Sequence, residues 1–412
     1  MARSYIIAGI DIGNAFVKTV IASLDKDSGR PRILGIGSFP SNGMRRGVVF
    51  DMEETINDIG QSVSRAQAMA DVKIKRAYVS INGLHIRSQT SRGVVAVSRA
   101  DNETSQNDMD RLIDAASTIS LPQNREIIHI IPKLFIIDGQ EYVKNPLGMK
   151  GVRLEAEVLI IDGLSPYIQN LAKCVNANDV EVIEFVFSPL ALSKAILGKH
   201  QKEHGVASID FGGGLSTLAV FHEGEILNTA VLPLGSRHIT NDLAVALRTS
   251  IESAEQIKLD YGFVNIEANE KGELDLSEVV DEADFIIPKK NLGKIIQARV
   301  EEVLDIVQTE LKKIPPTILL AGGIVLAGGG SNLDGFPLFV KDRLRLPVKS
   351  AALSNFGGIA DQMADPSFYV AAGLVLWGIE KEYSDFKPHK GFNFGNNRLF
   401  KKIANWAKNF LP

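Results

Sequence analysis

Two short segments of this 412-residue chain place an aspartate directly before a glycine-rich turn. DIGNAFVK offers Asp11, Gly13 and Lys18, and DFGGG offers Asp210 followed by three consecutive glycines. Glycines let backbone N–H groups approach phosphate oxygens closely because no Cβ stands in the way, and successive amides form an anion nest. A carboxylate before such a turn would repel a bare phosphate, so its useful role is to hold Mg²⁺ through water.

Either turn alone is a weak signal, because many β-hairpins contain Asp and Gly. An internal repeat makes the pair specific: AGIDIGNAFVKTVIA (8–22) and ASIDFGGGLSTLAVF (207–221) share one plan. Each has an apolar strand ending in Asp, a glycine-rich turn and a second apolar strand. A reversal signal, DKDSG (25–29) or HEG (222–224), then leads to a third strand. Two such halves predict a duplicated α/β fold whose loops face each other across a cleft.

Other elements must position these loops. A third glycine-rich loop, LAGGGSNLDGF (326–336), suits the base or ribose of a nucleotide. Apolar periodicity predicts helical stretches over 51–70, beginning at an Asp suited to N-capping, and over 239–262, ending at a Gly. Residues 84–162 contain the strand runs VVAVS, EIIHIIPKLFIID and EAEVLIID and the helix-like DMDRLIDAAS. This block predicts a small separate α+β subdomain.

Composition narrows the class of protein. With 45% hydrophobic residues the chain has enough for more than one domain core, and its single Cys174, read as a buried packing residue, fits a reducing cytoplasm. No secretory signal is visible, and the longest apolar run, 318–327, is about half of the roughly 20 residues that a spanning helix needs. The net charge of −4 combines −10 in the body with +6 in residues 386–412. An acidic body disfavours nucleic-acid binding.

The chain ends in RLFKKIANWAKNFLP, which has apolar residues on one helical face and basic and amide residues on the other. Such a helix commonly docks on the protein's own core; the alternative is a helix lying in a membrane interface. A basic tail on an acidic body favours the membrane. We therefore predict a flexible linker over 384–397 and a membrane-targeting amphipathic helix over 398–412. The residues expected to contact lipid are Arg398, Leu399, Phe400, Lys401, Lys402, Ile403, Trp406, Lys408, Phe410 and Leu411.

These segments resemble the actin/Hsp70/hexokinase ATPase superfamily. DIGNAFVK is similar to its first phosphate loop, IDFGGG to its second and AGGGSNLDG to its adenosine loop, while SPLALSKAIL and YVAAGLVLWG are similar to its two connecting helices. Within that superfamily the chain resembles FtsA, a family of bacterial actin-like cell-division proteins, over about residues 5–411. HIIPKLFIIDGQ and NPLGMKGVRLEAEVLIID resemble the FtsA inserted subdomain, and the segment 239–262 and the basic tail also resemble FtsA.

The resemblance implies a duplicated actin-like fold with an inserted α+β subdomain. The first actin-like domain would occupy 1–83 and 163–205, the insert 84–162, the second domain 206–368 and the second connecting helix 369–383. It also implies ATP as ligand, with Mg²⁺ held through water by Asp11 and Asp210, and at most slow ATPase activity. The implied nucleotide contacts are Asp11, Gly13, Asn14, Lys18, Asp210, Gly212, Gly213, Gly214, Ser216, Glu255, Lys258, Gly328, Gly329 and Gly330.

The chain departs from the family pattern in both phosphate loops. Asn14 stands where Thr or Ser is usual, and Phe16 occupies the expected Lys position, with Lys18 two residues later. In the second loop Leu215 and Thr217 replace a Thr and an Asp. Nucleotide binding by backbone amides is expected to survive these changes, which would act on hydrolysis and on metal placement around Thr217. For Glu255 and Lys258 the alternative is an exposed i, i+3 ion pair.

The implied partners are FtsZ, whose C-terminal tail would bind near the smaller subdomain of the second half, and later division proteins at the insert. Copies of the chain would form filaments on anionic lipid, at the cytoplasmic face of the cell membrane and at the division site. Two alternatives remain open. A pilus-assembly platform of the PilM type shares the insert but lacks such a tail. A sugar or acetate kinase needs a second-substrate pocket and a catalytic Asp, for which only Asp11 and Asp210 are candidates.

Overall fold

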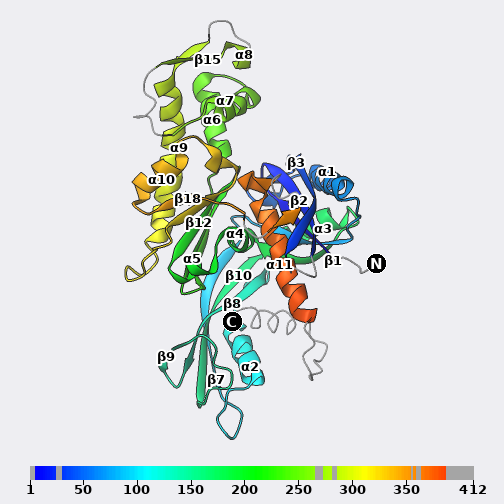
Figure 1. The fold of residues 1–412 in the computed structure, drawn as a ribbon, viewed down its shortest axis with the longest axis vertical. Helices are drawn as coiled ribbons and strands as arrows, with labels where there is room; N and C mark the ends of the chain where they lie inside the picture. Colours follow the sequence, from blue (N-terminus) through cyan, green and yellow to red (C-terminus); the bar gives the residue numbers. More distant parts are fainter. Residues whose placement is uncertain are drawn as a thin grey trace.

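The structure is a computed structural model that describes residues 5–24, 30–264, 272–280, 285–353, 356–358 and 363–386. Two mixed sheets with flanking helices form two halves of the molecule, and a third sheet extends away from them at one end (Figure 1). Each of the three units has its own cluster of buried apolar side chains. The three-part organisation follows from chain length, since a single core of this size would exceed the usual domain limit.

The first half is built on a six-stranded sheet. Its strand β2 (Phe16–Leu24), which pairs with β3 (Pro31–Pro40), is buried along most of its length, as expected for a strand covered by helices on both faces. On one face α1 (Met52–Ala70) approaches β3 at two glycines: a Cβ at Gly37 would lie 2.0 Å from the Ser62 carbonyl oxygen. In spatial order the strands are β11 (Glu181–Phe187), β6 (Arg76–Ile81), β1 (Tyr5–Ile12), β2 (Phe16–Leu24), β3 (Pro31–Pro40) and β19 (Gly357–Gly358).

The helix predicted over 51–70 is confirmed as α1, with Asp51 as its N-cap. The Asp51 carboxylate accepts a hydrogen bond of 3.1 Å from the backbone N–H of Glu54, which satisfies one of the free donors at the helix start. Cys174, on α3 (Ser165–Asn176), is buried against α1 as predicted, and burial raises the pKa of its thiol to about 11. A small hairpin of β4 (Met44–Arg45) and β5 (Val48–Val49) precedes α1.

The second half is built on a five-stranded sheet covered by longer helices. In spatial order its strands are β14 (Glu225–Leu232), β13 (Ser216–His222), β12 (Val206–Phe211), β17 (Ile324–Ala327) and β18 (Val348–Ser350). The remaining elements of this half are α6 (Ser236–Leu247), α7 (Ile251–Tyr261), β15 (Glu273–Asp275), α8 (Ser277–Val280), β16 (Ile286–Pro288), α9 (Lys289–Leu311), η2 (Gly329–Asn332) and α10 (Phe336–Leu344).

The helical stretch predicted over 239–262 is divided into α6 and α7. Arg248 adopts a left-handed backbone conformation (φ 54°), which ends α6, and Ser250 caps α7 by accepting a hydrogen bond from the N–H of Ser253. A left-handed residue cannot continue a right-handed helix, so the chain turns there. The two helices pack against each other, and α6 also packs against α9.

The insert is a four-stranded sheet with one helix on its face. Its strands in spatial order are β7 (Arg87–Ala96), β10 (Arg153–Leu164), β8 (Arg125–Ile137) and β9 (Gln140–Val143), and α2 (Gln106–Ser117) packs on β7 and β10. Ser105 and Asp108 form a reciprocal capping box at the start of α2. The predicted strand runs and the helix between them are confirmed as β7, α2, β8 and β10.

Two helices connect the halves. α4 (Ser188–Ile196) and α11 (Tyr369–Phe386) pack so closely that a Cβ at Gly373 would lie 1.9 Å from the carbonyl oxygen of Ala191. A short helix, α5 (Lys199–Glu203), follows α4, and a 3₁₀ turn, η4 (Pro366–Phe368), leads into α11. α11 extends to Phe386, three residues beyond the predicted end of the connecting helix. β19 lies within the range predicted for the second domain but pairs with β3 of the first half.

Three predicted segments lie wholly or mostly outside the described residues. These are the reversal signal at 25–29, most of the linker predicted over 384–397, and the whole amphipathic helix predicted over 398–412 with its lipid contacts. Within the described ranges, no helix combines the length and apolar character that crossing a bilayer requires.

Candidate functional site

The predicted strand–turn–strand repeat is confirmed in both halves. In the first half β1 and β2 pair antiparallel with Asp11 opposite Lys18, and the N–H of Gly13 donates to the carbonyl of Phe16 at 3.1 Å. In the second half β12 and β13 pair in the same way, with Asp210 opposite Thr217. β3 and β14 are the third strands. The two aspartates therefore occupy matching positions at the ends of matching strands.

The two turns touch each other. A Cβ added to Gly213 would lie 2.6 Å from the Cβ of Ala15, and one added to Gly214 would lie 2.8 Å from the Cβ of Asn14. Any larger side chain at these glycines would push the turns apart, because real Cβ contacts are not that short. The sequence therefore uses glycine here to bring the two halves together at the cleft.

The start of helix α6 is hydrogen-bonded to the second turn. The N–H groups of Ser236 and Arg237 at the start of α6 donate to the carbonyls of Gly212 and Gly213, each at 2.8 Å. These contacts use free donors at the helix start and orient the turn so that its carbonyls point toward the helix. The backbone on the other side of the turn is left to face the cleft.

The third glycine-rich loop closes the site beside Asp210. Gly328 has a positive φ of 83°, and a Cβ there would lie 2.2 Å from the Asp210 carboxylate. Gly330 is equally restricted, since its Cβ would lie 2.6 Å from the ring of Phe211. Only glycine fits both positions, so this loop packs directly against the strand that carries Asp210.

Lys18 is the cation that the first hairpin brings to the site. It is buried, and its ammonium lies 5.3 Å from the ring centroid of Phe16 and 5.0 Å from that of Phe368. Burial lowers the pKa of Lys18, while the nearby carboxylates of Asp365, Asp11 and Asp210 act in the opposite direction. The position of the ammonium among three carboxylates favours its charged form, so Lys18 is available to bind a phosphate.

The two aspartates are electrostatically coupled. Burial raises the pKa of Asp11 above its ordinary value, against the opposing effects of a hydrogen bond with Ser80 and of the Lys18 charge. Burial and the charge of Asp11 together raise the pKa of Asp210 to about 7, again opposed by Lys18. Carboxylates in this situation gain from a bound cation, which stabilises their ionised forms.

Glu255 and Lys258 form a partly buried network with Thr240. The Lys258 ammonium donates to both carboxylate oxygens of Glu255, at 2.8 and 2.6 Å, and to the Thr240 hydroxyl at 3.0 Å. The side chain of Lys258 is 6% exposed and that of Glu255 is 39% exposed. Both line the cleft, so they are not the exposed surface pair of the alternative interpretation.

The cleft between the halves has a volume of about 530 Å³, within the range of small-molecule sites. Two predicted contacts do not line it. Gly214 lies against Asn14, and Ser216 is buried, with its hydroxyl donating to the Leu234 carbonyl at 2.7 Å. The predicted residues that do line the cleft are Asp11, Gly13, Asn14, Lys18, Asp210, Gly212, Gly213, Glu255, Lys258, Gly328, Gly329 and Gly330.

Several lining residues were not predicted from the sequence, among them Ser38, Asn82, Asn332, Asp365 and Ser367. Asp365 caps η4, accepting hydrogen bonds from the N–H of Ser367 at 2.9 Å and from its hydroxyl at 2.5 Å. The segment ADPS before an apolar helix is a recognisable N-cap signal. Asn332 lies inside the predicted third loop and only needed to be read as part of it.

The departures from the family pattern have separate structural roles. The Asn14 side chain accepts a hydrogen bond of 2.8 Å from the N–H of Gly47, which ties the first turn to the β4–β5 hairpin. Phe16 is 46% exposed and packs over Lys18 at the cleft. Leu215 and Thr217 are buried, and Thr217 does not line the cleft. The Thr217 hydroxyl is therefore placed away from any ligand in the cleft.

The residues present fit a magnesium–nucleotide complex. The two glycine turns border the cleft, and Lys18 and the two coupled carboxylates line it beside them. In the described part of the chain no cluster of three or more His, Cys, Asp or Glu side chains forms a metal site. Two carboxylates suffice for Mg²⁺, which keeps several waters and takes further ligands from substrate phosphates.

Two family models match the chain. The model described as the SHS2 domain inserted in FtsA matches residues 83–162, and the model of cell division protein FtsA matches residues 207–373. Cell division protein FtsA of Neisseria meningitidis serogroup B is 36% identical over 408 residues, which cover 98% of each chain. That of Pseudomonas aeruginosa is 35% identical over 91% of this chain and 90% of its own. That of Bacillus subtilis is also 35% identical, over 91% and 84%.

Solved structures share the fold at low sequence identity. A chain of the PilM–PilN type IV pilus biogenesis complex superposes with a TM-score of 0.65 at 16% identity, covering 91% of this chain and 98% of its own. MreB 5 of Spiroplasma citri bound to AMPPNP superposes with a TM-score of 0.55 at 14% identity, covering 93% and 99%. The predicted actin-like fold with an inserted subdomain is thereby confirmed.

Proposed function

The chain belongs to the FtsA family of cell-division proteins, and on this premise we propose that it is an ATP-binding, polymerising adaptor. It would tether FtsZ and the other division proteins to the cytoplasmic face of the cell membrane at the division site. One observation supports nucleotide binding above all. The two glycine turns meet in one cleft of about 530 Å³, with Asp11, Asp210 and Lys18 beside them. The shared fold with an MreB bound to AMPPNP supports the same assignment.

The nucleotide is held by groups from both halves. Backbone N–H groups of the two turns and the Lys18 ammonium would bind the phosphates, and Asp11 and Asp210 would hold Mg²⁺ through water. When bound, the metal would supply positive charge to neutralise the phosphates. Glu255 and Lys258, with the loop at 328–330, contact the ribose and base. Because the ligand contacts both halves at once, binding favours their closed arrangement over any open one.

We expect ATP turnover to be slow. A hydrolytic site needs a side chain that orients the attacking water next to the terminal phosphate. In the second turn the positions that depart from the family pattern, Leu215 and Thr217, are buried, and the Thr217 hydroxyl is not in the cleft. ATP would therefore act mainly as a ligand that stabilises the polymerising conformation.

The last residues of the chain would provide the membrane attachment. They carry six Lys or Arg and no acidic residue from 386 to 412, with Trp406, Phe400 and Phe410 on the apolar face. Each basic residue near an anionic surface contributes about 1 kcal/mol, reduced by salt. A single tail therefore binds reversibly, and a filament that carries many tails binds far more tightly through multivalency.

Protein partners would use the two ends of the molecule. We place the C-terminal tail of FtsZ on the small subdomain of the second half, formed by α6 to α9, and later division proteins on the insert. These two regions lie at opposite ends of the structure (Figure 1). One chain is then able to contact both classes of partner at the same time.

Vesicle co-sedimentation tests the tethering proposal. The full chain is compared with one ending at Phe386, where α11 ends, on phosphatidylglycerol-containing and pure phosphatidylcholine vesicles, with and without ATP and Mg²⁺. We expect only the full chain to pellet, only with anionic vesicles, and more of it with ATP. If both chains stay in solution under every condition, the tail is not a membrane anchor and the PilM-like alternative returns. Phosphorylation of a small metabolite would instead favour a kinase.

A further inference from the structure

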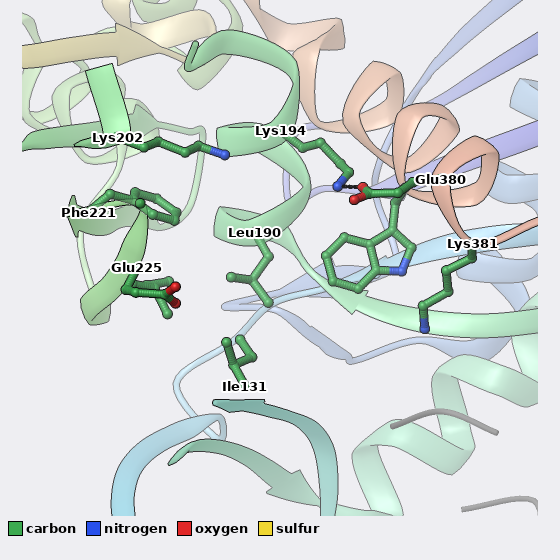
Figure 2. Close-up of a pocket in the computed structure, with 11 residues that line it drawn as sticks. Ile131, Leu190, Lys194, Lys202, Phe221, Glu225, Glu380 and Lys381 are labelled. Carbon is green, nitrogen blue, oxygen red and sulfur yellow. Dashed lines mark ion pairs between the residues drawn. The ribbon is translucent and has the colours of Figure 1, made fainter. Parts of the chain in front are cut away.

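A second, smaller pocket lies where the three parts of the molecule meet, away from the nucleotide cleft (Figure 2). Ile131 reaches it from β8 of the insert, Leu190 and Lys194 come from α4, and Trp377 and Glu380 from α11. The second half contributes Lys202 of α5 and the β13–β14 hairpin. The two pockets share no lining residue.

The floor of this pocket consists of apolar side chains, and contacts with neighbouring residues fix the position of the Trp377 ring. Ile131, Leu190, Phe221 and Ile226 are buried, and Trp377 lines the pocket with them. The Trp377 ring lies 5.4 Å from the ammonium groups of both Lys194 and Lys381, and its indole N–H donates to Glu184 at 3.4 Å. The volume is about 80 Å³, which admits one aliphatic side chain and excludes a nucleotide.

The rim of the pocket holds a cation without an anionic partner. Lys194 pairs with Glu380, and Lys381 pairs with Glu184. The Lys202 ammonium points into the space from α5 (Figure 2), where it lies 4.9 Å from the centroid of the Phe221 ring. Among the described residues no carboxylate lies within ion-pair distance of Lys202. A half-buried cation in this state gains from an incoming carboxylate.

The pKa values of the rim agree with this geometry. Burial lowers the pKa of Lys202 to about 8. Burial, followed by the charges of Lys202 and Lys381, lowers that of Lys194 to about 7. Within the described part of the chain Glu225, across the pocket, forms no ion pair with Lys202, and burial raises its pKa to about 7. An anion bound beside the lysines would raise their pKa values and strengthen its own binding.

We propose that this junction pocket docks a short acidic segment of a partner protein, with one leucine-sized side chain against Trp377 and a neighbouring carboxylate on Lys202. The chain's own tail does not fit, because residues 386–412 are basic and contain no Asp or Glu. A segment seated here contacts the insert, the connecting helices and the second half together. Its binding therefore fixes the arrangement of the three parts. The proposal does not depend on nucleotide binding.

Intrinsic fluorescence gives a direct test in the full chain. The chain has two tryptophans, so Trp406→Phe leaves Trp377 as the single reporter in the pocket. The probes are three blocked tetrapeptides: acetyl-Gly-Leu-Glu-Gly-amide, its Gln counterpart without the charge, and its Ala counterpart without the aliphatic anchor. We expect a saturable change in Trp377 emission with the Leu-Glu peptide, and about tenfold weaker binding of the other two.

A matched pair of lysine variants completes the test. Lys202→Gln removes the unpaired cation, and Lys199→Gln removes an exposed lysine of the same short helix outside the pocket. We expect the first to weaken Leu-Glu peptide binding about tenfold and the second less than twofold, with ATP affinity unchanged in both. Equal binding of the three peptides, equal effects of the two variants, or no saturable change up to about 10 mM peptide would each overturn the proposal. Loss of ATP binding alone would count against the nucleotide assignment and not against this pocket.

Discussion

The two hairpins that meet at the cleft share a backbone plan and differ in charge. Asp11 faces Lys18 across its hairpin, whereas Asp210 faces Thr217 across the matching one. Of the two hairpins, only the first therefore brings an ammonium group to the cleft, while Lys258 reaches it from α7. Asp210, with burial and the charge of Asp11 acting on it, has a pKa of about 7. The repeat sets where the two carboxylates lie, and the residue opposite each one sets its electrostatic surroundings.

The largest effect is expected where the hairpins touch. Gly213→Val places a branched side chain where even a Cβ would lie 2.6 Å from the Cβ of Ala15, so the turns must separate. Overpacking of this kind costs roughly 1–3 kcal/mol, and we expect ATP affinity to fall by up to about 100-fold. Titration with a fluorescent ATP analogue measures the change.

The control for that variant is Gly198→Ala, whose Cβ would find its nearest neighbour at an ordinary 3.5 Å. Its ATP affinity should equal that of the wild type. If Gly213→Val bound ATP normally while its circular dichroism showed an intact fold, contact between the two turns would not be part of the site.

The next variant makes the first hairpin resemble the second. Lys18→Thr removes the ammonium that lies opposite Asp11, and a charge-assisted hydrogen bond to phosphate is typically worth 1.5–3 kcal/mol. We expect ATP affinity to drop roughly 10- to 100-fold, measured by isothermal titration calorimetry. The control variant Thr217→Val changes the matching residue of the second hairpin, which is buried and outside the cleft. We expect it to change ATP affinity less than twofold. Similar losses in both variants would mean that the two hairpins contribute equally.

A pH experiment separates the two aspartates. The folded-state pKa of Asp210, about 7, lies above its ordinary value of 3.8, so the folded protein loses stability as pH rises through this interval. Asp210→Asn has no proton to lose there. Without nucleotide or Mg²⁺ we expect it to raise the unfolding midpoint by a few degrees at pH 8 and to have no effect at pH 5, where the wild-type residue is protonated.

Differential scanning fluorimetry at both pH values makes this measurement, with the exposed Asp260→Asn as the matched control. Saturating ATP and Mg²⁺ should reverse the order at pH 8, because the wild type then gains the cation contact that the variant lacks. A stabilisation that is the same at pH 5 and pH 8 would contradict the coupling between Asp11 and Asp210.

The smallest effect concerns the network in the second half. Thr240→Val removes a hydroxyl that donates to Glu255 and accepts from Lys258. We expect the free energy of unfolding in urea to fall by about 1 kcal/mol and ATP affinity to fall less than threefold. Thr249→Val, in the α6–α7 connection, is the control and should change neither. If Thr240→Val lost as much ATP affinity as Lys18→Thr, the network of the second half would contribute as much to nucleotide binding as the lysine of the first hairpin.

Patterns with a local physical cause were predicted well. The two hairpins depend on Asp-Gly turns between apolar strands, and α1 depends on the Asp51 cap. The insert was visible because its strands and its helix have different periodicities. The break between α6 and α7 was missed because nothing in the residue type marks Arg248 as left-handed, although Ser250 was an available cap signal.

Contacts that depend on tertiary packing were not predictable from the sequence. Asp365 is more than 340 positions from Lys18, and only the packing of α11 on the first sheet brings them together. The resemblance implied Ser216 as a nucleotide contact, but strand alternation turns its side chain inward, where it donates a hydrogen bond to the Leu234 carbonyl. The pairing of β19 with β3 crosses between the halves and leaves no local pattern in either segment.

The packing of α11 has a geometric consequence for assemblies. Gly9 and Gly373 admit no side chain between α11 and its neighbours, so the helix has one fixed direction in every copy of the protein. Its 18 residues span about 27 Å from the wall of the cleft to Phe386, the last described position. In any regular array of copies, Phe386 therefore recurs on one side and at the repeat distance of the array. The subunit spacing alone would then set the surface density of whatever follows Phe386 in the chain.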